Sequence, residues 1–392
     1  MDYYMYLKIN RLFQKAILCL GFCLTIGVAF GQTDTISVPK QFFNVAVILP
    51  FKTDKVDAKN PNPVDRAVFE LIQGMEIARC QLADSGIGIN LIMYDTKSSP
   101  VVTNSILSEP ELKKVDAIIG PVSALSAAAV AEFARRNKIL MLNPLSSKLL
   151  WDIDNDYAVL GSSTSFTIAK KAANYALKNF PSEKVGIVYG PNERDSLIAF
   201  QYKQLMTDSG KNVVLYHKVG KNSAANLTKF IANSGLDSTG HLFVPNNEKS
   251  VRTQLIGAVQ GLKINTPILT WGNWIEEPTA IYDLFEQANV HFIWPDGFQP
   301  ESIDYKTFQN QFQKKYHKNS SEAAAAGFED LWLIAKGLST VGKERLKDWV
   351  HQPKAIKAKL IGGYLYFGAN DNQVLPFFKF VNGNLVEVPI ED

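Results

Sequence analysis

The sequence is poor in the residues from which metal sites and disulfides are built. Of its 392 residues, 3 are cysteines and 5 are histidines. Two of the cysteines lie in an N-terminal apolar segment, so removal of that segment would leave only Cys80 and would exclude a disulfide within the chain. We expect the Cys80 thiol to be packed among neighbouring side chains. The histidines are scattered without a pair at metal-ligand spacing, so neither a metal nor another cofactor is expected.

Motifs for catalysis and nucleotide binding are also missing. The sequence contains no P-loop, no glycine-rich dinucleotide fingerprint, no nucleophile elbow of the hydrolase type and no HExxH zinc motif. Two acidic pairs, Glu276-Glu277 and Glu329-Asp330, could supply acid–base groups. Adjacent helical residues point apart, however, and we interpret both pairs as parts of a solvated face. The formal net charge of +3 gives no electrostatic case for nucleic acid. We therefore expect neither an enzyme nor a nucleic-acid-binding protein.

The N-terminus has the pattern of an export signal. Three basic residues precede the mostly apolar run 16–30, and Ala29-Phe30-Gly31 has the small–x–small shape of a signal-peptidase site. The run is shorter than the roughly 20 residues that span a bilayer. We expect residues 1–31 to be a signal peptide, cleaved before Gln32, and the mature protein to be periplasmic. An uncleaved membrane anchor is the alternative.

Short apolar runs alternate with amphipathic stretches between residue 44 and about residue 295. The first five predicted strands are 44–50, 89–95, 116–120, 139–143 and 157–161. The second five are 184–190, 212–217, 241–245, 267–271 and 290–295. Nearly continuous apolar runs are typical of parallel strands that are covered on both faces. We predict an α/β fold with two parallel, doubly wound sheets of five strands each.

The last part of the chain breaks this alternation. Residues 304–316, 322–340 and 343–350 are predicted helices. They are followed by predicted strands at 364–367 and 376–381, with Asn382-Gly383 as a hairpin turn. A chain that makes strands, then helices, then strands again indicates that two lobes exchange segments.

Hydroxyl groups gather where two strands of the first set end. Ligands of open α/β sheets collect outside the carboxyl ends of the strands. Ser123 and Ala124 begin a predicted helix just after strand 116–120, and the N–H groups at such a helix start suit a carboxylate or another anion. The alternative is that Ser123 only caps the helix. Ser146 and Ser147 follow strand 139–143 at the same edge and are further candidates.

The strands of the second set end in amides, an arginine and tryptophans. The candidate ligand contacts there are Arg194, Asn246, Asn273 and Trp274. Trp271, Trp274 and Trp294 lie at strand ends, and tryptophan offers a flat, amphipathic contact surface. We expect at least one of these indoles to be exposed as a wall of the ligand site.

Several segments together resemble one known family. They are VAVILPF, QGMEIA, YDTKSSP, VDAIIGPVSALSAAAVAEFARRNKILMLNPLSS, KVGIVYGPN, AAGFEDLWLIAKGL and GGYLYFGANDNQ. In order and spacing, across roughly residues 43–382, they resemble the type I periplasmic binding proteins, in particular the branched-chain amino acid receptors of ABC transporters.

The resemblance implies two lobes that are joined by three crossovers and clamp a ligand between them. The crossovers are expected near 158–163, 297–303 and 355–365. Lobe one is expected to comprise residues 42–160 plus 300–355, and lobe two residues 161–299 plus 356–390.

In such receptors the ligand carboxylate meets the loops that match Ser123 and Ser146-Ser147. This chain differs where an aromatic residue often follows the first strand of lobe two, because Glu193-Arg194-Asp195 stand there. It also has Asn273 at the site that matches the ammonium-binding acid. The resemblance therefore implies the fold but not the identity of the ligand.

The function that the resemblance implies is capture of a small polar or amino-acid-like ligand by hinge closure, by a monomer that serves an ABC permease. An envelope protein associated with peptidoglycan, or a sensory protein of the same fold, is the alternative. Neither interpretation involves nucleic acid.

Overall fold

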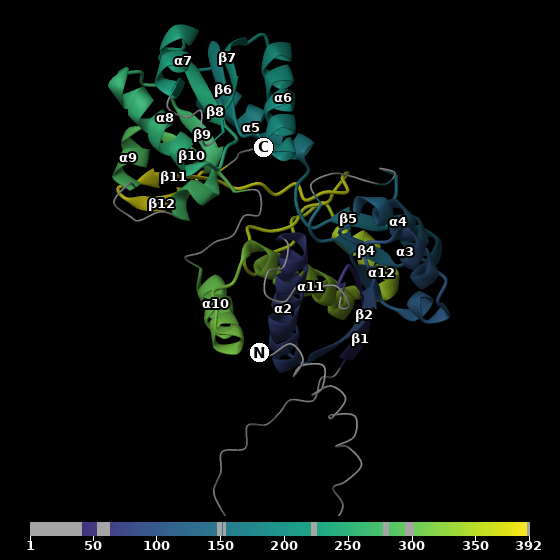
Figure 1. Ribbon diagram of the computed structural model, residues 1–392. Coiled ribbons are helices and arrows are strands. Elements are labelled where there is room, and N and C mark those ends of the chain that lie inside the picture. Colours follow the sequence, from purple (N-terminus) through teal and green to yellow (C-terminus); the bar gives the residue numbers. More distant parts are fainter. Residues whose placement is uncertain are drawn as a thin grey trace, which may run out of the picture. The chain divides into compact units, whose positions relative to one another are not determined.

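The computed structural model describes residues 41–52, 63–146, 151, 154–220, 226–276, 282–294 and 302–389 (Figure 1). The predicted signal peptide, Ser147 and most of the second predicted crossover lie outside these residues. In the described part of the chain, every helix is too short or too polar to cross a membrane.

The first sheet contains five parallel strands in the order β2-β1-β3-β4-β5. They are β1 (Gln41–Leu49), β2 (Ile87–Asp95), β3 (Ala117–Ile119), β4 (Leu140–Asn143) and β5 (Ala158–Leu160). All five match predicted strands. These strands are continuously apolar because both faces of the sheet are buried. In β1, Val45 and Val47 belong to the core on one face of the sheet, and Ala46 and Ile48 belong to the core on the other face.

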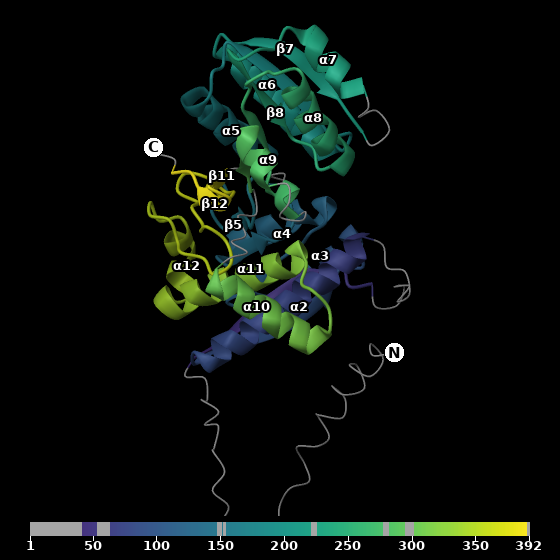
Figure 2. The same ribbon diagram turned by 90° about the vertical axis from the view of Figure 1, so that its left-hand side faces the viewer.

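Helices cover both faces of this sheet. One face packs against α2 (Pro63–Asp84), α10 (Ile303–Tyr316), α11 (Glu322–Val341) and α12 (Lys343–Val350). The other face packs against α3 (Pro100–Leu107), the short 3-10 helix η1 (Pro110–Lys114) and α4 (Ala124–Asn137). Figure 2 shows α2, α10 and α11 as neighbours. Apolar side chains of the segment from Ile356 to Tyr366 also belong to the core on the α11 side.

α2 and α11 approach each other closely enough for backbone contact. A Cβ on Gly74 would lie 1.7 Å from the carbonyl oxygen of Ala324, and one on Gly327 would lie 2.0 Å from that of Leu71. Only glycine leaves room for this crossing. The contact fixes α11 as a rigid wall of the first sheet's domain.

The second sheet has seven strands in the order β12-β11-β10-β9-β8-β6-β7. They are β6 (Lys184–Tyr189), β7 (Asn212–Lys218), β8 (Gly240–Val244), β9 (Ile268–Trp271), β10 (Val290–Ile293), β11 (Phe377–Val381) and β12 (Asn384–Glu387). β6 to β10 are parallel, as predicted, whereas β11 pairs antiparallel with both β10 and β12.

The prediction of five strands in this sheet was wrong because the C-terminal hairpin joins it. The hairpin itself was predicted, and Asn382 and Gly383 make its turn with φ angles of 52° and 73°. The predicted strand 364–367 is not formed; only an isolated bridge pairs Ile356 with Tyr364.

The helices around the second sheet also lie on two faces. One face packs against α5 (Ser165–Asn179) and α6 (Glu193–Asp208). The other packs against α7 (Leu227–Ser234), α8 (Lys249–Gly261) and α9 (Tyr282–Gln287). The α/β fold with two sheets is therefore confirmed. The expectation for Cys80 was wrong: its thiol lies on the exposed face of α2.

Candidate functional site

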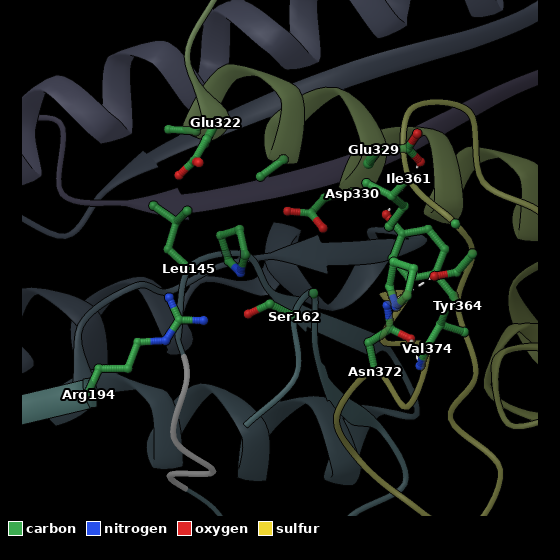
Figure 3. Close-up of a pocket in the computed structure, with 17 residues that line it drawn as sticks. Leu145, Ser162, Arg194, Glu322, Glu329, Asp330, Ile361, Tyr364, Asn372 and Val374 are labelled. Carbon is green, nitrogen blue, oxygen red and sulfur yellow. Dashed lines mark hydrogen bonds between the residues drawn. The ribbon is translucent and has the colours of Figure 1, made fainter. Parts of the chain in front are cut away.

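A pocket of about 360 Å³ opens at the carboxyl ends of β4 and β5 (Figure 3). Its walls come from five parts of the chain: the loop after β4, the loop after β5, the start of α6, the first half of α11 and the segment that leads to β11. The lining residues used below are Leu145, Gly161, Ser162, Arg194, Glu322, Ala323, Glu329, Asp330, Ile361, Tyr364 and Asn372. The position agrees with the expectation that ligands collect at this edge of an open sheet.

The two loops of the first sheet are joined to each other. The Asn143 side chain, at the end of β4, accepts a hydrogen bond from the backbone N–H of Ser146 at 3.2 Å. The hydroxyl of Ser162 donates to the carbonyl of Ser146 at 3.3 Å. These bonds hold the β4 loop against the β5 loop, with Leu145 facing the pocket (Figure 3).

α11 presents one helical stripe to the pocket. The side chain of Ser321 caps the helix by accepting from the N–H of Ala324 at 3.2 Å. The helix then turns one side to the pocket at two levels. The pocket is lined by Glu322 and Ala323 at the first level and, two turns later, by Glu329 and Asp330. The sequence therefore brings acidic groups to the pocket from two levels of one rigid helix.

Glu329 and Asp330 are buried, with side-chain exposures of 1% and 2%. The interpretation of this pair as part of a solvated face was therefore wrong. α11 is covered by α2 on one side and by the segment around Tyr364 on another, so residues that point apart on this helix are both enclosed. Figure 3 shows the Asp330 carboxylate pointing into the pocket and Glu329 pointing toward Ile361.

Glu329 is bound by the backbone of the segment that leads to β11. Its Oε1 atom accepts the N–H of Lys359 at 2.8 Å and also the N–H of Leu360. Its Oε2 atom accepts the hydroxyl of Tyr364 at 3.4 Å. Burial raises the pKa of Glu329 to about 7, and the bonds from Leu360, Lys359 and Tyr364 oppose that rise.

Asn372 shapes the rest of this wall. Its Oδ1 atom accepts the N–H groups of Leu365 and Val374, and its Nδ2 atom donates to the carbonyl of Gly363. The Ser163 hydroxyl donates to the carbonyl of Asn372 at 2.6 Å. The chain after β5 and the chain before β11 are thereby held together.

Arg194 brings a positive charge to the pocket from the start of α6. Asn192 caps that helix by accepting from the N–H of Asp195 at 2.8 Å. The guanidinium points toward Leu145 (Figure 3). Its Nε atom is buried and has no hydrogen-bond partner among the described residues.

The predicted contacts from the first sheet lie at the expected edge. Ser146 is in the β4 loop described above, and Ser147 lies outside the described residues. Ser123 occupies the N-cap position of α4 and Ala124 is its first residue, but the Ser123 side chain makes no capping hydrogen bond. Of the predicted site residues that the structure describes, only Arg194 lines the pocket itself.

Two of the other predicted contacts of the second sheet, Asn246 and Trp274, have structural partners. The Asn246 side chain donates to the carbonyl of Val219 and accepts from the N–H of Glu248. The Trp274 indole donates to the carbonyl of Asn246 at 2.7 Å. Asn273 lies in the 3-10 helix η3 (Gly272–Glu276), where its Oδ1 atom is buried and accepts no hydrogen bond from the described residues.

The expectation of an exposed indole does not hold. Trp271, Trp274 and Trp294 are exposed by only 6%, 1% and 9%. Each packs with apolar side chains of the second sheet and its helices, because the strand ends are covered there. Their large apolar area stabilises the fold instead.

The pocket thus holds one guanidinium and three carboxyl groups, and Glu329 is engaged with the backbone. The described residues contain no cluster of histidine, cysteine and acidic side chains that suits a metal ion. This arrangement is suited to holding a small polar molecule by charge-assisted hydrogen bonds.

The sequence is matched by the family model described as periplasmic binding protein over residues 72–378. The chain belongs to the periplasmic binding protein family. This membership confirms the resemblance seen in the sequence. The family is one of binding proteins and not of enzymes, as the sequence analysis expected. Periplasmic binding proteins act outside the cytoplasm, while cleavage of the signal peptide stays a prediction. A search of the curated proteins found no significant match.

Solved structures share this fold. A putative branched-chain amino acid ABC transporter protein from Rhodospirillum rubrum superposes with a TM-score of 0.65 at 12% identity, covering 88% of this chain and 99% of that one. A substrate-binding protein from Desulfitobacterium hafniense, in complex with leucine, gives 0.55 at 17% identity over 88% and 100% of the chains. A solute-binding protein from R. palustris, in complex with benzoate, gives 0.53 at 14% identity over 88% and 95%.

Proposed function

We propose that this periplasmic binding protein captures a small polar, amino-acid-like solute in the pocket beside β4, β5 and α11 and does not transform it. The observation that carries the proposal is the pocket, where Arg194 and Asp330 extend opposite charges into one space (Figure 3). A ligand with both an anionic and a cationic group would satisfy the two together.

The anionic group is assigned to Arg194. A guanidinium binds a carboxylate through two parallel hydrogen bonds, and Arg194 lines the pocket. Leucine, bound by the Desulfitobacterium hafniense protein named above, and benzoate, bound by the R. palustris protein, both carry a carboxylate. Further ligand contacts are proposed from the loops of the first sheet, at Ser123, Ala124, Ser146 and Ser147.

The second sheet is proposed to contribute Asn246, Asn273 and Trp274 to the ligand site.

The cationic group is assigned to Asp330, with Glu322 at the mouth of the pocket. Charge-assisted hydrogen bonds are about twice as strong as neutral ones. Removal of one such bond costs about 1.5–3 kcal/mol, which is roughly ten- to a hundredfold in affinity.

Closure of two lobes is proposed as the capture step. The lobes would be residues 42–160 plus 300–355 and residues 161–299 plus 356–390, with the two sheets as their centres; the apolar side chains between Ile356 and Tyr366 nevertheless pack in the core of the first sheet. The hydrogen bonds between Ser163 and Asn372, and between the Thr164 N–H and Asp371 Oδ2 at 2.7 Å, link the chain after β5 to the chain before β11. A ligand would shift the protein toward the closed form only if it binds that form more tightly than the open form.

The partner proposed for the loaded protein is an ABC permease, and the protein is proposed to act as a monomer after cleavage of residues 1–31. An envelope or sensory protein of the same fold, without a permease, is the second candidate. Permease and ATPase genes beside the gene for this chain would favour the first.

Native mass spectrometry of protein purified gently from its own envelope tests the proposal. We expect a mass difference from one small molecule, which is lost on denaturation and restored by adding the purified compound. If no compound co-purifies and a panel of amino acids and aromatic acids, with leucine and benzoate included, fails to bind, the solute-binding function is wrong.

A further inference from the structure

The imidazole ring of His351 lies between two other segments of the chain. His351 is the C-cap residue of α12, and its backbone N–H donates to the carbonyl of Lys347. On the ring, Nδ1 lies 3.0 Å from the carbonyl oxygen of Tyr366, and Nε2 lies 3.0 Å from that of Asp156. Tyr366 belongs to the segment that leads to β11, and Asp156 comes just before β5. One side chain therefore spans three parts of the chain.

Both partners of this ring are hydrogen-bond acceptors. A carbonyl oxygen has no proton to donate, so a ring nitrogen must carry a hydrogen in order to bond with it. A neutral imidazole has one N–H group and one lone pair, whereas an imidazolium has two N–H groups. The protonated ring can therefore make both bonds. The neutral ring can make only one, and it turns a lone pair toward the other carbonyl.

The charged groups of α12 and of the chain before β5 leave room for a cation here. The Lys347 ammonium binds the carboxylates of Asp348 at 3.0 Å and Asp156 at 3.8 Å. Two carboxylates thus stand against this one cation beside His351. The ammonium also lies over the Tyr157 ring, 5.7 Å from its centroid. The C-terminal end of α12 carries the negative end of the helix dipole, which favours a cation at the C-cap.

The segment that leads to β11 brings an aromatic group to the ring and no charge. The Tyr366 ring lies edge-on, with its centroid 6.3 Å from that of the imidazole. Burial raises the pKa of the Tyr366 hydroxyl, so that group stays neutral. The next cation along the chain after His351 is Lys354, which is exposed to solvent and therefore screened.

The segment that His351 contacts adjoins two walls of the pocket. The Tyr366 hydroxyl donates to the carbonyl of Leu160 at 2.9 Å, and residues 161–162, which follow directly, line the pocket. The Tyr366 ring stacks on that of Tyr364, with centroids 6.2 Å apart, and Tyr364 lines the pocket as well. A change in the bonds of His351 can therefore reach both walls.

We propose that His351 is a proton-sensitive positioning residue: its imidazolium ring clasps the chain before β5 to the segment that leads to β11, and loss of the proton opens one side of this clasp. The clasp stands on the two ring contacts; its consequence for ligand capture rests on the proposed function. The clasped form prefers the proton, because only the protonated ring makes both bonds. Histidine changes its charge between about pH 5 and 8, so the clasp is complete in mildly acidic medium and opens more easily as pH rises.

Two backbone amides report on the clasp. The N–H of Ala369 donates to the same Tyr366 carbonyl at 3.0 Å, and the N–H of Leu160 donates to the carbonyl of Asn370 at 2.8 Å. Hydrogen–deuterium exchange of the full chain, without any ligand, measures both at pH 5.5 and pH 8 after correction for the intrinsic rate. We expect their protection to fall by about three- to tenfold as pH rises, the effect of one hydrogen bond. Amides of β9 should keep theirs.

His351→Gln keeps one donor nitrogen and cannot change its charge, so its amide protection should be the same at both pH values. His317→Gln is the matched control, because His317 is an exposed histidine at the C-cap of another helix, α10. It should keep the pH dependence of the wild type. The buried His241 and His291 do not interfere, since burial lowers the pKa of each to about 4, below the range tested.

Equal protection at both pH values in the wild type would overturn the proposal, and this comparison decides even if the His351 variant does not fold. A pH dependence that persists in His351→Gln would overturn it too, because the dependence would then come from another group, such as the buried Glu329. Loss of the pH dependence in His317→Gln has the same meaning. Each of these results leaves the solute-binding function standing, since no ligand takes part.

Discussion

Gly161 lies directly against the carboxylate of Asp330: a Cβ at residue 161 would come within 2.6 Å of Asp330 Oδ1. Gly161 follows β5, whereas Asp330 lies on α11, far along the sequence. The absence of a side chain at residue 161 allows the carboxylate to reach the pocket. The position of this acidic group therefore depends on one residue of the neighbouring loop.

Gly161→Ala should displace the Asp330 carboxylate and weaken ligand binding by about tenfold, the loss of one charge-assisted hydrogen bond. Calorimetric titration with the ligand identified by mass spectrometry measures the change. Gly257→Ala, at an exposed helical glycine with open space around it, is the control and should bind normally. Unchanged affinity in Gly161→Ala would remove Asp330 from the set of ligand contacts.

Stability should depend on pH through Glu329. Its pKa is about 7 in the folded chain and ordinarily 4.5, so between these values the folded state keeps a proton that the unfolded state has lost. The free energy of unfolding should therefore fall as pH rises through this window, by roughly 3 kcal/mol relative to Glu329→Gln. Chemical denaturation of both proteins at pH 4.5, 6 and 7.5 checks this. Parallel curves would show that Glu329 titrates normally.

The crossing of α2 and α11 should tolerate no side chain. Gly327→Ala would place a Cβ 2.0 Å from the carbonyl oxygen of Leu71, so the helices must separate at a cost of about 3 kcal/mol or more. Gly257→Ala should instead stabilise the protein by about 0.5–1 kcal/mol, because alanine favours a helix. Urea denaturation distinguishes the two. Equal stability of both variants would contradict the close packing.

The Ser123 hydroxyl is not used to cap α4, so Ser123→Ala should change the free energy of unfolding by less than about 0.5 kcal/mol. Ligand affinity should nevertheless fall about ten- to a hundredfold if this hydroxyl binds the anionic group. Ser302→Ala is the contrasting variant: the Ser302 side chain caps α10, and its loss should cost about 1 kcal/mol without an effect on binding. A reversed pattern would assign Ser123 to the cap.

The sheets could be predicted because their strands carry the strongest local signal. Runs such as 44–50 are apolar on both faces and end at turns, and each of the ten predicted parallel strands is present. The C-terminal hairpin was found from Asn382-Gly383. Its attachment to β10 was not found, because pairing between strands distant in sequence leaves no local pattern.

The pocket was harder to predict because its walls are assembled from distant segments. Arg194 could be found, since it follows a strand. Glu329 and Asp330 were assigned to a solvated face by helical geometry alone, although the apolar sequence around them pointed to a helix buried on most sides. Charged residues within such a helix are the signal that could have identified the site. The role of Gly161 depends on a contact that only the folded chain makes.

The central claim, that a solute occupies the pocket, is tested most directly by filling that pocket. Ala323 lines it, so Ala323→Trp places an indole in the space, whereas Lys336→Trp adds the same bulk to an exposed position further along α11. Affinity for the identified ligand is measured by calorimetric titration of both variants and the wild type. We predict loss of binding in Ala323→Trp and wild-type affinity in Lys336→Trp, with both proteins folded by circular dichroism. Wild-type affinity in a folded Ala323→Trp would contradict the account and place the ligand elsewhere.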